Sequence, residues 1–219
     1  MTSLEMQYDF DSKIRAHGKL SDTAIASTDT ELFLRAAEES LIRKHAALFD
    51  KNAESRKYLN ILIQTTIYNN TEIFTNTTNL TNGVYLKLPA TVKYTLLERI
   101  GITNGTTNFD SRVEEITSEY YNLNYNNPFK NPYKDMCWRM VYGVDNVGDK
   151  NMIHQLILPS NFTFQYYKLT YICYHIPVNI TTNTTSQLDS TIHPELVRLA
   201  VDLAIESFRI TEKISAKSA

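Results

Sequence analysis

Apolar residues recur at helical spacing over the first third of the chain. Between residues 28 and 49 they fall three or four positions apart, which places them on one face of a helix, with charged residues on the other. Thr28 and Glu31 have the spacing of a capping box, so we expect the helix to begin here. The pattern predicts a second, shorter helix over residues 53–64, after a break at Lys51-Asn52.

The end of the chain carries the most apolar helical pattern. His193-Pro194-Glu195 places a proline and an acid in the first turn, where backbone amides lack partners and the helix dipole is positive. The apolar positions that follow cover more than half of the helical circumference: Leu196, Val197, Leu199, Ala200, Val201, Leu203, Ala204 and Phe208. A helix with so wide an apolar surface must be largely buried, and we expect it to pack against the first helix.

Between these helices the pattern changes to that of β-strands. β-branched and aromatic residues dominate residues 66–191, and Asn82-Gly83 is a strong turn signal. Strands are expected over residues 84–88, 94–100, 137–142 and 166–174. In the last of these strands, Tyr167, Leu169, Tyr171 and Cys173 alternate along the chain and therefore share one face. Residues 110–125 have a more helical pattern than the rest of this region.

These patterns together predict an α+β fold. The N- and C-terminal helices form a small bundle from residues 28–65 and 192–210, and a long β-rich part over residues 66–191 is inserted between them. Residues 1–27 are polar and lack a sustained period, so we expect a flexible arm, and residues 211–219 form a C-terminal tail. Both ends are candidates for docking on adjoining molecules, because extended segments gain order from a partner.

The overall composition argues against several classes of protein. The chain has 219 residues, of which 42% are hydrophobic and 21% charged, and its formal net charge is −2. This balance gives no sign of the strongly basic face of a protein that wraps nucleic acid. We see no secretory pattern, no apolar run near the ~20 residues that span a bilayer, and only two cysteines. We therefore expect a soluble protein, without membrane contact, that assembles in a reducing cytoplasm.

No recognised catalytic motif occurs in the chain. It contains neither a Gly-rich phosphate loop, nor a Gly-x-Ser-x-Gly elbow, nor a His-Glu-x-x-His pair. Cys173 and His175 could lie on one strand face and hold a metal ion together with Cys137 and His154. The alternative, which we favour, is that both cysteines are small core residues and that the histidines bond to polar neighbours. We expect no enzymatic activity, no cofactor and no metal.

Tyrosine is abundant, with 14 residues in the chain. Tyrosine rings can stack on single-stranded bases, but basic residues are not interleaved with them densely enough for that use. Tyrosine also suits strands and protein interfaces, where the ring buries a large area and the hydroxyl keeps a hydrogen bond. We favour the interface interpretation, which places contacts with neighbouring molecules in the Tyr-rich β region.

Several segments in order along the chain resemble structural proteins of crAss-like phages, specifically their neck and ring proteins. These segments are Tyr8-Asp9-Phe10-Asp11, residues 30–39, residues 84–90, residues 126–132 leading to Trp138-Arg139, residues 171–178, and residues 193–197 running on through Glu206. The Asn/Thr-rich stretch 69–83 has no counterpart in this resemblance.

The resemblance implies a head–tail adaptor similar to podophage tail tubular protein A. Such adaptors combine a helical bundle with a β-sandwich or barrel, and about twelve copies form a ring beneath the portal. It also implies contacts with the portal or with neighbouring neck and tail proteins, and transient passage of genomic DNA. The expected location is the virion neck or tail, after assembly in the host cytoplasm. The alternative is a soluble binding module or an enzyme that uses Cys173 and His175.

Ring assembly directs attention to residues that could contact neighbours. We expect subunit contacts in the loop over residues 126–133 and in the Tyr-rich strands, and docking on adjoining rings through the C-terminal tail. The candidate interface residues are Asn126, Pro128, Phe129, Tyr133, Tyr167, Ile210, Lys213 and Lys217.

Overall fold

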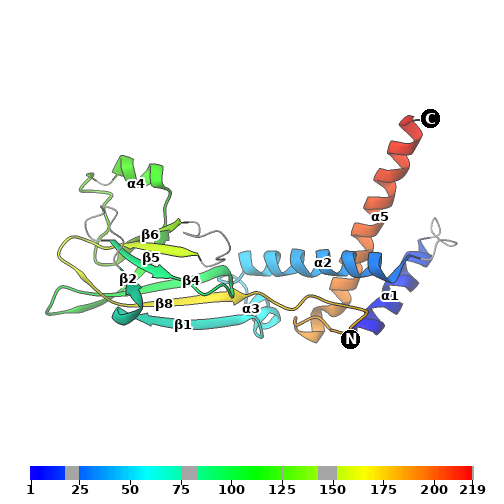
Figure 1. Ribbon diagram of the computed structural model, residues 1–219, viewed down its shortest axis with the longest axis horizontal. Coiled ribbons are helices and arrows are strands. Elements are labelled where there is room, and N and C mark those ends of the chain that lie inside the picture. Colours follow the sequence, from blue (N-terminus) through cyan, green and yellow to red (C-terminus); the bar gives the residue numbers. More distant parts are fainter. Residues whose placement is uncertain (18–24, 75–82, 125, 143–151, 219) are drawn as a thin grey trace. The chain divides into compact units, whose positions relative to one another are not determined.

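The computed structural model describes residues 1–17, 25–74, 83–124, 126–142 and 152–218 (Figure 1), with residues 210–218 described by their backbone alone. The chain divides into two compact units. A helical unit combines Met1–Leu62 with Tyr174–Ala219, and a β unit comprises Ile63–Cys173. Helices from both ends of the chain therefore flank a β insertion, as the sequence pattern predicts.

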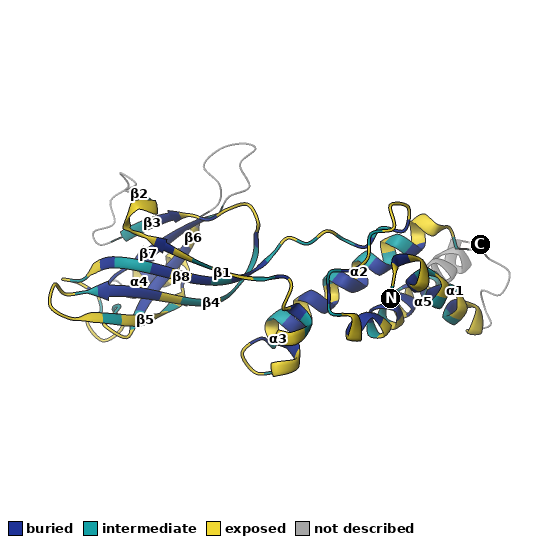
Figure 2. Cartoon of the chain, turned by 90° about the horizontal axis from the view of Figure 1, so that it is seen from below, coloured by how far each residue is buried: buried dark blue, intermediate teal, exposed yellow. Residues whose placement is uncertain are grey.

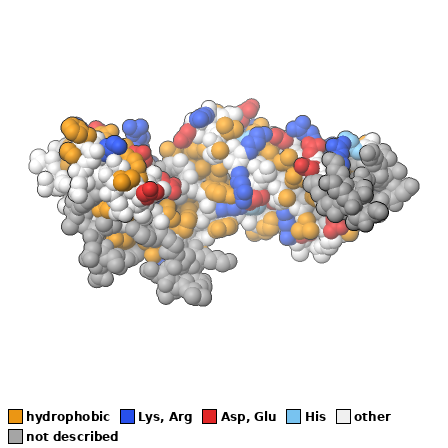
Figure 3. Space-filling view, turned by 90° about the horizontal axis from the view of Figure 1, so that it is seen from above, with side chains coloured by type: hydrophobic (Ala, Val, Ile, Leu, Met, Phe, Trp, Pro, Cys, Tyr) orange, Lys and Arg blue, Asp and Glu red, His pale blue; other side chains and the backbone are white. Residues whose placement is uncertain are grey.

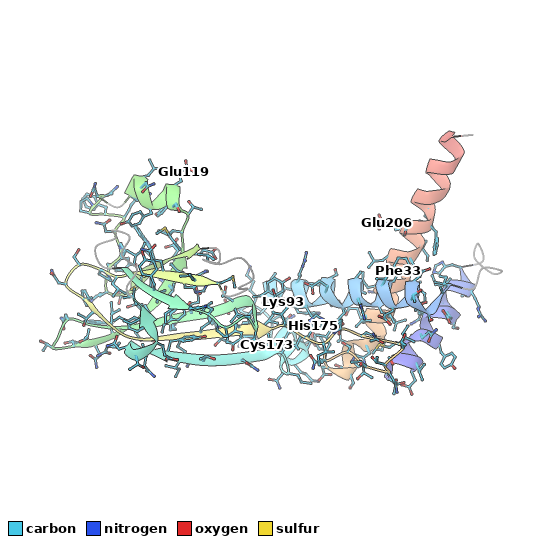
Figure 4. All side chains as sticks on the ribbon, in the orientation of Figure 1. Phe33, Lys93, Glu119, Cys173, His175 and Glu206 are labelled. Atoms are coloured by element: carbon cyan, nitrogen blue, oxygen red, sulfur yellow. The ribbon has the colours of Figure 1, made fainter. Side chains whose placement is uncertain are left out.

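The helical unit is held together by apolar faces of helices that lie far apart in the sequence. Its helices are α1 (Ser3–Ala16), α2 (Ser27–Ala47), α3 (Ala53–Leu59) and α5 (His193–Ser218), and the 3-10 helix η2 (Ser190–Ile192) precedes α5. Both α1 and α2 pack against α5. Phe33 of α2, which is labelled in Figure 4, contacts Phe10 and Phe208, each at 6.3 Å between ring centroids. The predicted packing of first and last helices is confirmed.

The N-terminal segment is a helix rather than the predicted flexible arm. α1 begins at a capping box formed by Thr2 and Glu5, and it buries Met6, Phe10 and Ile14. These three residues make a stripe only one residue wide, too narrow to identify a helix among so many polar neighbours. The wide apolar surface of α5 covers this stripe and stabilises the helix.

Other predicted boundaries also shift. α2 begins at Ser27 with Ala26 at the N-cap and no side-chain capping bond, so the capping box predicted at Thr28 is wrong. The helix predicted over residues 53–64 ends at Leu59, because β1 begins at Ile63. The predicted tail over residues 211–219 instead continues α5 through Ser218.

The segment between β8 (Thr163–Cys173) and η2 is held against α2 by side chains of that helix. The carboxylate of Glu38, which is fully buried, accepts hydrogen bonds from the amide of Val178 (3.1 Å) and the hydroxyl of Ser186 (2.5 Å), and it lies 3.3 Å from Nε2 of His175. Elsewhere on this helix, Glu31 accepts from the amide of Ile180. These side chains satisfy backbone groups that have no strand partner.

We expect Glu38→Ala to destabilise the helical unit by about 3 kcal/mol, because it leaves a buried amide and a buried hydroxyl without an acceptor. Circular dichroism at 222 nm during urea unfolding measures the loss. Glu39→Ala is the matched control, since Glu39 is the next acid along α2 and forms an exposed pair with Arg43, so its loss should change stability by less than about 0.5 kcal/mol. Equal losses in the two variants would contradict the role given to Glu38.

Among the described residues, the β unit forms a sheet of eight strands, in the order β1-β8-β4-β5-β6-β7-β3-β2. The strands are β1 (Ile63–Asn69), β2 (Ile73–Phe74), β3 (Gly83–Lys87), β4 (Val92–Thr103), β5 (Asn108–Glu115), β6 (Met136–Tyr142), β7 (Ile153–Ile157) and β8 (Thr163–Cys173), and the 3-10 helix η1 (Asn70–Glu72) follows β1. Strands that are neighbours in this order pair antiparallel, except that β5 and β6 are parallel. A parallel pair needs a crossover connection, and here that connection contains α4 (Ser118–Asn124).

The sheet curls upon itself. β8 and β7 are four positions apart in the sheet order, which in a flat sheet would separate them by roughly 19 Å. Instead, the hydroxyl of Tyr167 on β8 lies 3.1 Å from Nδ1 of His154 on β7. The inner faces of the strands enclose an apolar core that includes Leu86, Ile100, Leu156 and Leu169 (Figure 2). The expected barrel-like insertion is confirmed.

Two sequence-based expectations in the β unit have clear outcomes. The predicted common face of Tyr167, Leu169, Tyr171 and Cys173 is confirmed, because all four belong to or pack against this core. The helical prediction for residues 110–125 is wrong in its first half, where β5 extends to Glu115, and right in its second half, where α4 lies. The predicted turn at Asn82-Gly83 begins at a position outside the described residues.

Candidate interaction surfaces of the β unit

The connection between β5 and β6 exposes several large apolar side chains. Phe129 is 96% exposed and Leu123 is 74% exposed, and Tyr120 and Tyr133 are also exposed. We call these four residues together with the exposed Glu119 the α4 surface. Figure 4 shows Glu119 on α4, and the space-filling view shows hydrophobic side chains on the β unit beside charged ones (Figure 3).

This connection is fastened to the sheet from beneath. Tyr121 is buried and, like Tyr120, meets the indole of Trp138 on β6 in an edge-on contact, at 6.4 and 5.7 Å between ring centroids. Trp138 also belongs to a small core cluster with Ile116, Met140 and Ile157. The inward side of α4 is therefore packed, and Leu123 is left on its outward side.

The loop after α4 holds Phe129 in an exposed position. The amide of Asn127 donates to the carbonyl of Asn124, and the side-chain oxygen of Asn127 accepts from the amide of Phe129 at 3.0 Å. The amide of Lys130 in turn donates to the carbonyl of Asn127. These bonds form a compact turn that leaves the phenyl ring of Phe129 exposed.

The predicted interface residues fall into three groups. Asn126, Pro128, Phe129 and Tyr133 are exposed, and all lie in the β5–β6 connection. Tyr167 is fully buried in its own unit, so the prediction that it contacts a neighbour is wrong. Ile210, Lys213 and Lys217 lie on α5, and their side chains fall outside the described residues.

A second surface lies on the outer face of the strands at the other end of the sheet order. The register aligns Ile67 of β1 with Lys168 of β8, Lys168 with Arg99 of β4, and Arg99 with Arg112 of β5. Three cations therefore stand side by side across three adjacent strands, and all are exposed. Within the described residues, none of their side chains forms a hydrogen bond or an ion pair. We use the name basic face for five residues: these three cations together with the exposed Ile67 and Leu97.

A hollow of about 380 Å³ opens on the basic face, and it is lined by Leu97, Arg99, Asp110, Tyr166, Lys168 and Thr170. One wall is the ring of Tyr166, which crosses Gly101 on the neighbouring strand and reaches the carboxylate of Asp110 with its hydroxyl at 3.3 Å. A Cβ atom on residue 101 would lie 2.2 Å from this ring, so only glycine leaves room for it. The sequence pattern does not identify this hollow, because it arises from strand pairing.

A network of polar side chains, all buried except Glu115, crosses the interior of the same sheet. Arg139 on β6 donates to Glu98 on β4, to Glu115 on β5 at 2.6 Å and to Nε2 of His154 at 3.3 Å. Tyr167 donates its hydroxyl hydrogen to Glu98 at 2.7 Å. Because a guanidinium has only donors, Nε2 of His154 must accept, and Nδ1–H then donates to the oxygen of Tyr167.

Burial determines the protonation of this network. It lowers the pKa of the His154 imidazole to about 3, with the charge of Arg139 acting in the same direction. Burial also raises the pKa of the Glu98 carboxyl, although Arg139 and the hydrogen bond from Tyr167 act in the opposite direction. Glu98, Arg139, His154 and Tyr167 are all at least nine-tenths buried. Their burial and their bonds between strands place them to brace the curl of the sheet.

The side chains considered for a metal site have separate surroundings. Cys137 is buried in the core, where burial raises the pKa of its thiol to about 12, and burial also raises the pKa of Cys173. Both ring nitrogens of His154 are engaged in the network, and His175 lies against Glu38. Among the residues that the structure describes, no three His, Cys, Asp or Glu side chains gather as a metal site would require.

Comparison with known proteins relates the chain to a phage family. Residues 1–215 match the model of a family described as phage tail ring protein 3/4, the crAss ring 3/4 family. No curated protein matches the chain. Among the described helices, none has the length and apolar character that crossing a membrane demands. The match spans both units and confirms the resemblance to crAss-like phage ring proteins, so the chain belongs to the family of crAss-like phage tail ring proteins 3/4.

Proposed function

We propose that this chain is a non-enzymatic subunit of a ring in the phage neck, and that copies join side by side through the α4 surface. The observation that carries the proposal is Phe129, which is 96% exposed on a turn held by Asn127. Burying a phenylalanine side chain stabilises a contact by roughly 1.5–3 kcal/mol, and exposed apolar groups of this size typically mark interfaces.

The turn favours binding for a second reason. Association requires loops and side chains at the interface to lose freedom, which opposes binding. The bonds of Asn127 hold the turn before any partner arrives, so little of this loss remains. Leu123 and Tyr133 in the same connection are exposed as well and add apolar area. This supports a central apolar anchor surrounded by weaker contacts.

The position in the neck is part of the proposal. We propose a closed ring, with twelve copies as the expected number, that joins the portal to adjoining neck or tail proteins and surrounds the path of the DNA. The formal net charge of −2 supports passage without tight binding, because strong DNA binding depends on many cation–phosphate contacts. The α5 helix, which runs to Ser218, is a candidate for docking on an adjoining ring.

Phe129→Ser tests the proposal. We expect the wild-type chain to form rings, either alone or when co-expressed with the other virion structural proteins, and the variant to associate at least tenfold more weakly. Sedimentation velocity and negative-stain electron microscopy measure the assemblies. Tyr8→Ser is the matched control, because Tyr8 is another exposed aromatic residue, 73% exposed on α1.

Two results would overturn the proposal. If the wild-type chain stayed monomeric even in the presence of all other virion structural proteins, it would not be a ring subunit. If Phe129→Ser formed rings as readily as the wild type, the α4 surface would not be the contact.

A further inference from the structure

We infer that the α4 surface of one copy docks on the basic face of the next copy, so that the ring closes through a head-to-tail contact between β units. This inference rests on the proposed function and names both halves of its interface. A ring needs two different, mutually complementary patches on each subunit, whereas a contact of one patch with itself stops at a dimer.

The two surfaces are placed as such a contact requires. α4 covers the outer side of β6 through Trp138, and the basic face is carried by β1, β8, β4 and β5. β8 lies three positions from β6 in a sheet that curls, so the outer sides of these two strands face different directions. Figure 1 shows α4 on one side of the β unit and β8 and β1 on the other.

The two surfaces are also complementary in charge. Lys168, Arg99 and Arg112 stand opposite one another across the strands, and like charges so placed destabilise a sheet unless an anion approaches them. On α4, Glu119 and Leu123 are four residues apart and exposed, so they share one face of the helix. That face offers a carboxylate to the cations of the next copy.

The apolar parts of the two surfaces match as well. Ile67 and Leu97 are 53% and 42% exposed and flank the cations of the basic face. The hollow next to them is lined by Leu97 and the ring of Tyr166. Arg99 and Lys168 also line it and can stack over the aromatic ring of a side chain that enters. Phe129 is an exposed ring on a held turn and fits these surroundings.

The pattern of charges favours a second copy over a polyanion such as DNA. Asp110 and Glu114 lie on β5 two positions to either side of Arg112, on the same outer face. Asp110 also lines the hollow. These carboxylates would repel successive phosphates, whereas a protein surface with one acid among apolar side chains can avoid them.

Two variants, each altered on one surface, test the contact. The first carries Glu119→Lys and Phe129→Ser, and the second carries Arg99→Glu and Lys168→Glu. We expect each variant alone to be monomeric under conditions in which the wild type forms rings. An equimolar mixture should form dimers that contain one copy of each variant, because one intact pair of surfaces remains. Native mass spectrometry distinguishes these dimers from homodimers.

Controls separate folding from assembly. Trp138 is the single tryptophan and is buried in the β unit, so its fluorescence during urea unfolding shows whether each variant still folds. The double variant Lys51→Glu/Arg198→Glu makes the same change in charge as Arg99→Glu/Lys168→Glu, but on exposed residues of the helical unit. It should leave the rings intact. Folded variants that both still form rings, that form homodimers, or that stay monomeric when mixed would overturn the pairing. If the pairing failed in one of these ways but the wild type still formed rings, the proposed function as a ring subunit would still hold.

Discussion

Replacing Arg139 with methionine is expected to lower the free energy of unfolding of the β unit by about 3–5 kcal/mol. The guanidinium is 4% exposed and is the cation beside the carboxylate of Glu98, which is itself 9% exposed. Methionine keeps much of the side-chain volume but leaves that carboxylate buried without a cation. Urea unfolding followed by Trp138 fluorescence measures the change, since Trp138 lies in the same unit.

A second substitution identifies the cause of this loss. In Glu98→Gln/Arg139→Met, no charge is left buried at the pair, and the amide oxygen can still accept from Tyr167. We expect the double variant to be more stable than Arg139→Met alone. Arg112→Met is the matched control on the exposed side of the sheet and should change stability by no more than about 0.5 kcal/mol. Additive losses at Glu98 and Arg139 would rule out the charge-pair explanation.

Acid is expected to destabilise the β unit through His154. The imidazole keeps a pKa of about 3 in the folded protein, against an ordinary value of 6.5, so below pH 6.5 the unfolded chain binds a proton that the folded chain does not. Stability from this group is complete above pH 6.5 and is lost as the pH falls toward 3. The loss amounts to about 1.4 kcal/mol at pH 5.5 and about 2.7 kcal/mol at pH 4.5.

The comparison of wild type with His154→Gln isolates this effect. Glu98 acts in the opposite direction, because its raised pKa favours the protonated carboxyl in the folded protein as the pH falls, and it is present in both proteins. The advantage of the wild type over the variant should therefore shrink between pH 7 and pH 4.5 in urea unfolding monitored by Trp138. Parallel stability curves over this range would show that His154 is not protected from protonation.

The locations of the interaction surfaces were only partly predictable. The family resemblance indicates the loop over residues 126–133 as a contact, and the structure leaves Phe129 exposed there. Tyr167 was chosen because tyrosine suits interfaces, but its hydroxyl serves the buried network instead. Apolar and polar residues alternate along a strand in the same way whether its apolar face packs in the core or forms an interface. A tyrosine on that face therefore does not reveal which of the two applies. Only the curl of the sheet decides between them.

The sequence by itself determined the order of the elements in this protein. Helical spacing over residues 28–49 and from His193 onward, and strand-like alternation between them, follow from local backbone geometry and so can be recognised locally. The tertiary structure decided what depends on residues far apart in the chain. α1 is stable because α5 covers its narrow stripe, and Arg139 meets Glu98 across 41 residues of intervening chain. Lys168, Arg99 and Arg112 become one basic face only because strand register aligns them, and no local pattern specifies that register.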